Sequence, residues 1–79
     1  MASEQRLAIL AYLAHGSDAS AADLADALGF SLPAAGMHLL RLTRSGLVNR
    51  TLDRREGCYC HSISVKGLAR LRFLQKGST

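Results

Sequence analysis

The sequence has few of the residues on which several protein classes depend. It contains no tryptophan, one proline and two cysteines in 79 residues, and aromatic residues make up 5% of the chain. Two cysteines separated by one residue cannot build the disulfide framework of a small secreted domain, so a reducing compartment is expected. No hydrophobic run approaches the roughly 20 residues that cross a bilayer, and the N-terminus lacks a basic segment followed by a hydrophobic one. We therefore expect a cytoplasmic protein that does not contact membranes.

Acidic residues are scarce in the second half of the chain. Residues 1–40 carry one basic and four acidic residues, a net charge of −3, whereas residues 41–79 carry nine basic and two acidic residues, a net charge of +7. The overall net charge of +4 therefore conceals a strongly basic C-terminal half. Such asymmetry indicates a polyanionic partner, and a solvated basic face is the alternative explanation.

Length and composition predict one small domain over residues 1–79. Hydrophobic residues make up 48% of the chain, which favours a folded helical domain over a disordered tail. Apolar residues at helical spacing predict a first helix over residues 3–15. One face of this helix carries Leu7, Leu10, Ala11 and Ala14. Further apolar residues extend the surface to a second side, and they are Ile9, Tyr12 and Leu13. We expect either that the core encloses both sides or that one side packs against a partner subunit.

Residues 20–48 contain two helical patterns separated by a tight break. Ser20 and Ser31 stand where each helix should have its N-cap, because a serine oxygen accepts hydrogen bonds from the free N–H groups of the first turn. Gly29 supplies the left-handed residue that ends the first helix, and Pro33 fits the first turn of the second. Two short helices joined by such a turn form a helix-turn-helix.

The hydrophobic period changes after this motif. Residues 47–52 and 58–63 are strand candidates, and the polar turn 53–57 between them contains a glycine, so a hairpin is predicted. Ser64 is expected to cap a last helix over residues 65–76. The predicted fold class is mainly α with a small β-hairpin wing.

The chain resembles the winged helix-turn-helix family of bacterial transcription regulators. The similarity is carried by the LADALGFS segment at 24–31, by Pro33 and by the Gly-Leu-Val sequence at 46–48. The SISVKG segment at 62–67 looks like the junction that follows the wing in MarR-type regulators. In size and in the Arg-Arg pair at 54–55, the chain is also similar to the small FaeA/PapI-like regulators of fimbrial operons.

The resemblance implies a non-enzymatic regulator that binds double-stranded DNA sequence-specifically as a homodimer. Helix 32–45 would enter the major groove, and the wing at 53–57 would contact the backbone or the minor groove. The likeness to FaeA/PapI-like regulators adds a protein co-regulator as a partner. The residues expected at the DNA interface are Ser31, Leu32, Ala34, Met37, His38, Arg41, Arg44, Arg50, Arg54 and Arg55.

The front of helix 32–45 departs from the family, because apolar residues replace the usual polar ones. Only Ser31 and His38 can hydrogen-bond there, so bidentate contacts from Arg to guanine or from Asn and Gln to adenine cannot form. One explanation is that Ala34 and Met37 contact thymine methyl groups while DNA shape adds selectivity. A second is that a partner protein supplies the specificity.

A third explanation makes this helix a protein-binding surface on a repurposed winged helix. The apolar residues that would form the patch lie on neighbouring turns, and they are Leu32, Met37 and Leu40. Under this alternative the domain is a protein–protein interaction module.

The CYCH segment at 58–61 raises a metal or redox hypothesis. Cys58 and Cys60 would point the same way on a strand, but two thiols and one histidine lack C-x-x-C spacing and a fourth zinc ligand. A disulfide across two strand positions has poor geometry.

Neither a Ser/His/Asp arrangement nor a phosphate-binding glycine loop is present. We expect no metal, no cofactor and no enzymatic activity.

Overall fold

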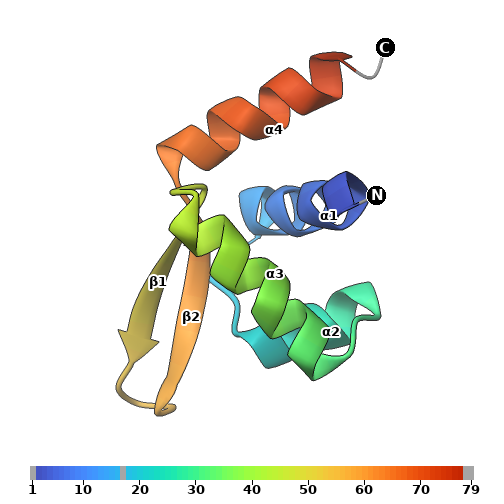
Figure 1. The fold of residues 1–79 in the computed structure, drawn as a ribbon. Helices are drawn as coiled ribbons and strands as arrows, with labels where there is room; N and C mark the ends of the chain where they lie inside the picture. The colour runs from blue at the N-terminus through green and yellow to red at the C-terminus, as the bar shows by residue number, and fades with distance from the viewer. Residues whose placement is uncertain (1, 17, 78–79) are drawn as a thin grey trace.

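The computed structural model of the protein describes residues 2–16 and 18–77. This part of the chain folds into four helices and one antiparallel β-hairpin, which confirms the predicted class of a mainly α winged helix-turn-helix (Figure 1). None of these helices combines the length and the apolar character needed to cross a membrane. The elements are α1 (Ala2–His15), α2 (Ala21–Leu28), α3 (Leu32–Arg44), β1 (Val48–Asp53), β2 (Cys58–Ile63) and α4 (Val65–Gly77).

Serine caps hold the helix-turn-helix as the sequence predicts. The Ser20 hydroxyl accepts a hydrogen bond from the Asp23 N–H at 3.1 Å, and the Asp23 carboxylate accepts one from the Ser20 N–H at 3.0 Å. This reciprocal capping box satisfies two N–H groups at the start of α2. The Ser31 hydroxyl accepts from the Ala34 N–H at 3.2 Å, and Gly29 ends α2 with φ +74°. Local hydrogen bonds therefore fix both sides of the turn.

The centre of the core is built around α1, and both apolar sides of this helix contribute to it. Ile9, Leu10 and Leu13 are nearly inaccessible and pack with leucines of α2 and α3. The other residues of the first apolar face are half-buried and pack against this core, and they are Leu7, Ala11 and Ala14. Of the two alternatives, the enclosed core helix describes most of this surface, whereas Tyr12 is 37% exposed.

The wing is the whole hairpin of β1 and β2 with the turn between them, and it has a buried base and an exposed outer part. β1 and β2 are antiparallel, with Val48 opposite Ile63 and Leu52 opposite Tyr59. Because side chains alternate along a strand, these four residues share one face with the pair Arg50 and His61. Val48 lies in the core, whereas Leu52 and Tyr59 near the turn are 48% and 49% exposed. One face of the hairpin thus serves both the core and the surface.

The start of α4 is tied to the turn between α3 and β1. The Ser64 hydroxyl accepts from the Gly67 N–H at 2.9 Å, as predicted for an N-cap, and the Ser64 N–H donates to the Leu47 carbonyl at 3.0 Å. The Lys66 ammonium donates to the Ser45 carbonyl at 3.0 Å. A β-carbon at Gly67 would overlap the Leu47 carbonyl oxygen. Glycine is therefore required here by the close approach of two backbone segments.

Candidate nucleic-acid interface

One side of α3 lies in the core and the other is free. Ala35, Leu39 and Leu42 form its buried face. In the front half of the helix, Leu32 is 56% exposed and Met37 is 50% exposed. These values show that the apolar residues singled out in the sequence lie on the surface and not in the core.

Two small residues, Ser31 and Ala34, were also predicted at the interface, and both lie near the N-terminus of α3. Ser31 is exposed and its hydroxyl oxygen accepts the capping hydrogen bond, which leaves its proton available to an acceptor outside the chain. Ala34 is half-buried, so its methyl group is only partly accessible. The front of α3 therefore offers apolar surface with one hydroxyl group.

His38 packs against the aromatic ring of Phe30, and the ring centroids are 5.5 Å apart. Its Nδ1 atom is buried, and within the described ranges it has no hydrogen-bond partner. A contact to DNA from this half-buried side chain would consequently have to use Nε2.

The predicted arginines are exposed, and they are distributed over three elements. Arg41 and Arg44 lie in the last turn of α3, three positions apart on the helix surface. Arg50 projects from β1, while Arg54 and Arg55 occupy the turn between the strands. Each of these guanidinium groups remains charged at neutral pH and can contact phosphate.

The shape of the hairpin turn depends on Asp53, which the sequence analysis did not single out. Its carboxylate accepts hydrogen bonds from the N–H groups of Arg55 and Glu56, at 2.9 and 3.3 Å. The Gly57 N–H donates to the Asp53 carbonyl at 2.8 Å, and Gly57 has φ +69°. Asp53 thereby organises the turn that carries the two arginines, a role that its position at the start of an Asx-type turn could have revealed.

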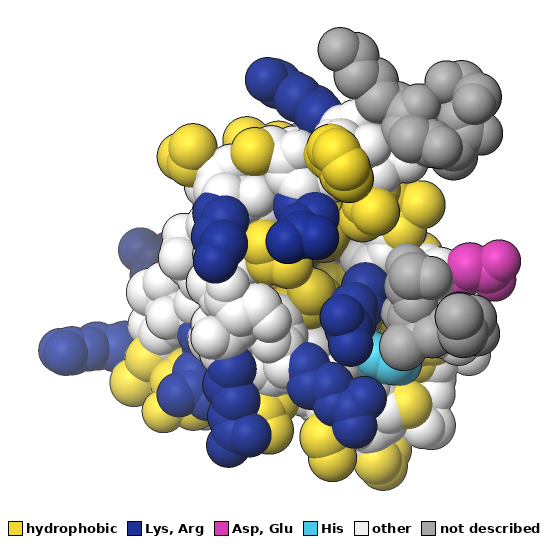
Figure 2. Space-filling view, turned by 45° about the horizontal axis from the view of Figure 1, so that its top comes forward, with side chains coloured by type: hydrophobic (Ala, Val, Ile, Leu, Met, Phe, Trp, Pro, Cys, Tyr) yellow, Lys and Arg dark blue, Asp and Glu magenta, His cyan; other side chains and the backbone are white. Residues whose placement is uncertain are grey.

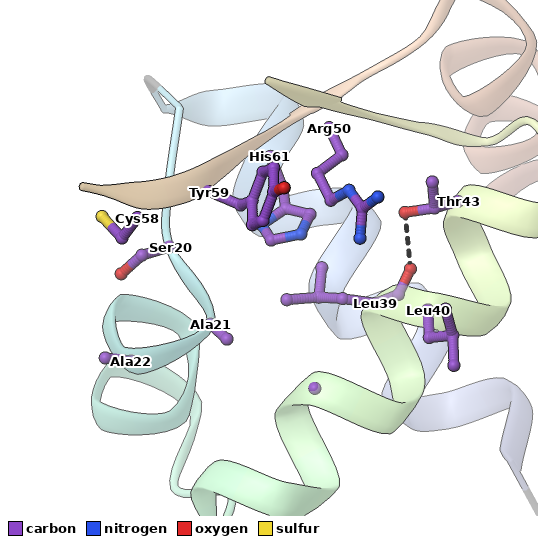
Figure 3. Close-up of a pocket in the computed structure, with 11 residues that line it drawn as sticks. Ser20, Ala21, Ala22, Leu39, Leu40, Thr43, Arg50, Cys58, Tyr59 and His61 are labelled. Atoms are coloured by element: carbon purple, nitrogen blue, oxygen red, sulfur yellow. Dashed lines mark hydrogen bonds between the residues drawn. The ribbon is translucent and has the colours of Figure 1, made fainter. Parts of the chain in front are cut away.

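A groove of about 500 Å³ separates α3 from the wing (Figure 3). Gly36, Leu40 and Thr43 line it from α3, and Arg50 and Tyr59 line it from the strands. The Arg50 guanidinium carbon lies 4.5 Å from the centroid of the Tyr59 ring, within the range of a cation–π contact. Tyr59 is thus an interface candidate that the sequence analysis missed, although strand register places it on the same face as Arg50.

His61 joins the wing to the segment between α1 and α2. Its backbone exchanges two hydrogen bonds with Ala19, at 3.0 and 2.7 Å, and its Nδ1 lies 3.1 Å from the Ala19 carbonyl oxygen. The side chain is 6% exposed, and this burial lowers its pKa. The Arg50 charge lowers the pKa further, whereas the hydrogen bond to Ala19 opposes the change. His61 is therefore a neutral buried group at pH 7.

The two cysteines are free and half-buried on β2. Burial raises the pKa of Cys60, and the neighbouring Cys58 thiol adds to the effect. Across residues 2–16 and 18–77, no group of three His, Cys, Asp or Glu side chains is arranged to hold a metal ion. The raised pKa keeps the Cys60 thiol protonated at neutral pH.

Basic side chains dominate one face of the molecule. Figure 2, which brings the α4 side forward, shows Lys and Arg side chains spread over this face with hydrophobic side chains between them. Acidic side chains appear in this view only at one edge. The uneven charge of the sequence is therefore also uneven in space.

Comparisons with known proteins agree with this architecture. A profile of the helix-turn-helix domain family matches residues 1–51. Comparison with curated proteins gives no significant match. A mutant of MepR from S. aureus aligns with a TM-score of 0.83 and 23% identity, over 91% of this chain and 54% of that chain.

Two other solved structures are similar in fold. The complex of S. aureus MepR with DNA aligns with a TM-score of 0.80 and 23% identity, over 90% of this chain and 60% of MepR. The transcriptional regulator BldR from Sulfolobus solfataricus gives 0.82 and 22%, over 90% of this chain and 51% of BldR. The chain thus spans between half and three-fifths of the length of these proteins.

The structural matches establish the winged-helix fold, as the resemblance to MarR-type regulators implied. The profile match covers the first three helices and most of β1, which is more than half of the chain. The protein belongs to the helix-turn-helix domain family.

Proposed function

We propose that this protein is a cytoplasmic, sequence-specific transcription regulator that binds double-stranded DNA. In this proposal α3 enters the major groove and the turn of the wing contacts the backbone or the minor groove. The observation that carries the proposal is that exposed arginines lie both at the end of α3 and on the wing. These two elements would flank a DNA strand. MepR, which has the same fold, has been solved in complex with DNA, and this supports the proposal.

Phosphate contacts would supply most of the affinity. Arg41 and Arg44 can contact the backbone beside the major groove, and Arg54 and Arg55 can contact the backbone or the minor groove from the wing. Such contacts position a protein on DNA and make binding sensitive to salt, but they do not distinguish one base pair from another.

Sequence selection would depend on the apolar front of α3. Leu32, Ala34 and Met37 can contact thymine methyl groups, and Ser31 and His38 can each add one hydrogen bond. Since this set lacks a bidentate base contact, we expect moderate specificity in which DNA shape contributes. A protein co-regulator would raise that specificity further.

A homodimer is the assembly that we propose on DNA, because two-fold symmetric sites are usual for such motifs. The outer side of α1 supports this, since Ala8, Ala11 and Tyr12 form an apolar depression with Leu28 of α2. Phe73 on α4 is 70% exposed and adds apolar surface. Analytical ultracentrifugation should detect a dimer that Tyr12→Glu or Phe73→Glu weakens, and a concentration-independent monomer on DNA would contradict it.

Selection from a pool of random DNA duplexes tests the proposed function. The wild-type protein should enrich a motif that contains thymine-rich positions in two symmetric halves, one helical turn apart. Met37→Ala should relax the preference at the thymine positions without abolishing binding. Recovery of random sequences after several rounds would contradict sequence-specific regulation.

A second candidate function is a protein-binding module, because Leu32, Met37 and Leu40 expose apolar surface on α3. Met37→Glu separates the two functions. In a protein-binding module it should abolish partner capture, whereas in a DNA-binding protein it should weaken DNA binding by charge repulsion with phosphate. Absence of DNA binding by the wild-type protein at low salt would favour the module.

A further inference from the structure

The contact between Arg50 and Tyr59 joins two exposed residues of the wing. Arg50 lies opposite His61 in the strand register, and Tyr59 is two positions before His61, so both side chains project from the same face of the hairpin. The Arg50 guanidinium carbon is 4.5 Å from the Tyr59 ring centroid. Figure 3 shows the Arg50 side chain extending from β1 toward Thr43 of α3, with the Tyr59 ring beside it.

Neither residue is needed by the core. Tyr59 is 49% exposed and Arg50 is also an exposed residue, so their contact removes little apolar area from water. The buried base of the hairpin is held instead by Val48 and by the hydrogen bonds between His61 and Ala19. The Tyr59 ring is therefore better explained by its effect on the position of the Arg50 guanidinium than by a contribution to the core.

We propose that Tyr59 is a positioning residue that holds the Arg50 guanidinium in the groove between α3 and the wing, where it contacts a DNA phosphate. This inference rests on the proposed DNA-binding function. A free arginine side chain samples many rotamers, and ordering it on binding has an entropic cost. A cation–π contact made before binding restricts these rotamers, while the edge of the planar guanidinium remains available to hydrogen-bond phosphate.

The position of Arg50 distinguishes it from the arginines of the turn. Arg54 and Arg55 project from the end of the hairpin, whereas Arg50 lies beside Thr43 and Leu40, close to the helix that enters the major groove. The Thr43 hydroxyl donates to the Leu39 carbonyl at 2.7 Å, within α3. Among the described residues that line the groove, Arg50 is the one with a permanently charged side chain. Arg50 would therefore bind the strand that passes between α3 and the wing.

A double-mutant cycle measured by DNA-binding anisotropy tests the inference. Arg50→Ala should weaken binding roughly tenfold and reduce the slope of log K against log salt by about 0.9, the value for one phosphate contact. Tyr59→Leu should weaken binding about two- to fivefold, as expected for an exposed cation–π contact. In the Arg50→Ala background, Tyr59→Leu should cause no further loss.

Two matched variants separate positioning from other roles of Tyr59. Tyr59→Phe keeps the ring and should bind within twofold of the wild type, because the cation–π contact does not need the hydroxyl. Leu52→Ala removes the exposed residue opposite Tyr59 on the same face and should also bind within twofold. Circular dichroism should show equal folding of all variants, since the substituted side chains are exposed.

The outcomes distinguish this inference from the proposed function. Binding by the wild type together with additive losses in the cycle would overturn the positioning role and leave DNA binding intact. A loss for Tyr59→Phe equal to that for Tyr59→Leu would overturn it as well, because the hydroxyl itself would then contact DNA. Failure of the wild type to bind mixed-sequence DNA at low salt would overturn both.

Discussion

The two ends of the β-hairpin have different physical tasks although they belong to the same two strands. At the base, Val48 and His61 are buried and the backbone is tied to Ala19. At the outer end, Leu52 and Tyr59 are about half exposed, and the turn carries two arginines. The base therefore contributes to the free energy of folding, and the outer end is available for binding.

This difference shows how a small domain can keep stability and binding apart. An exposed arginine adds little to stability because its charge is already solvated. A buried backbone contact adds nothing to DNA binding unless the fold fails. Substitutions at the base should consequently change unfolding, and loss of an arginine or of the Tyr59 ring at the outer end should change affinity at constant stability.

The largest effect is expected at the junction that follows the base. Gly67→Ala places a β-carbon on the Leu47 carbonyl oxygen, so α4 must move away from the turn. We expect a loss of about 1–3 kcal/mol in the free energy of unfolding, the range for overpacked sites. Urea denaturation measures it.

Gly36→Ala is the matched control for this prediction. Gly36 lies inside α3, and no atom is within 4 Å of the position of a new β-carbon. Replacing a helical glycine by alanine should stabilise the protein by about 0.5–1 kcal/mol. Equal effects of both substitutions would show that the contact at Gly67 is not what limits that position.

The next effect concerns the outer end alone. Arg54→Ala combined with Arg55→Ala should weaken binding to all DNA sequences roughly 10- to 100-fold at low salt and reduce the salt slope by about 2, because two phosphate contacts are lost. The urea midpoint should stay unchanged. Anisotropy titrations at several salt concentrations measure the slope, with Arg72→Ala on α4 as the control. An unaltered slope would remove the turn of the wing from the interface.

A smaller effect is expected from pH at the base. Burial lowers the pKa of His61 below its ordinary value of 6.5, so the unfolded chain binds more protons than the folded one as the pH falls through 6.5. Stability should therefore be fully present above that pH and decrease as the solution becomes more acidic, until His61 is protonated in the folded state as well. Urea midpoints between pH 5 and 8 measure this, and His61→Gln should flatten the acidic part of the curve. An equally steep curve in His61→Gln would assign the effect to other groups.

The smallest effect is expected for the cysteines. Both cysteines lie on β2, and burial raises the pKa of Cys60, which keeps its thiol protonated. The variants to test are Cys58→Ser and Cys60→Ser. DNA affinity should change less than twofold, with or without a reducing agent. A change of tenfold on oxidation would give the thiols a regulatory role.

Local features of the fold were predictable because they depend on short segments. Ser20, Ser31 and Gly29 act at the helix ends where the sequence placed them, and the polar turn of the hairpin is where its glycine indicated. The predicted strand 58–63 coincides with β2, whereas the predicted strand 47–52 begins and ends one residue before β1. Either Leu47 or Val48 fits the start of a strand. These signals require no knowledge of distant contacts.

Features that depend on packing were not predictable. The deep burial of Ile9 and Leu13 depends on the space left by α2 and α3, which the sequence of one helix does not reveal. From the sequence alone, Gly67 is only a residue that lowers the stability of the last helix. Its close approach to Leu47 is known only from the packing of α4 against the turn before β1. For the candidate site, the exposure of the arginines was predictable from charge, whereas the contact between Arg50 and Tyr59 required the strand register.

The central claim is that the exposed arginines of α3 and the wing form a phosphate-binding surface. Fluorescence anisotropy of the wild-type protein with a mixed-sequence DNA duplex, repeated from about 50 to 200 mM salt, tests it most directly. The proposed interface predicts measurable binding at low salt and a log–log slope of about −4 to −5, as expected if each of the five arginines contacts one phosphate. No binding at the lowest salt concentration, or a slope near zero, would contradict it.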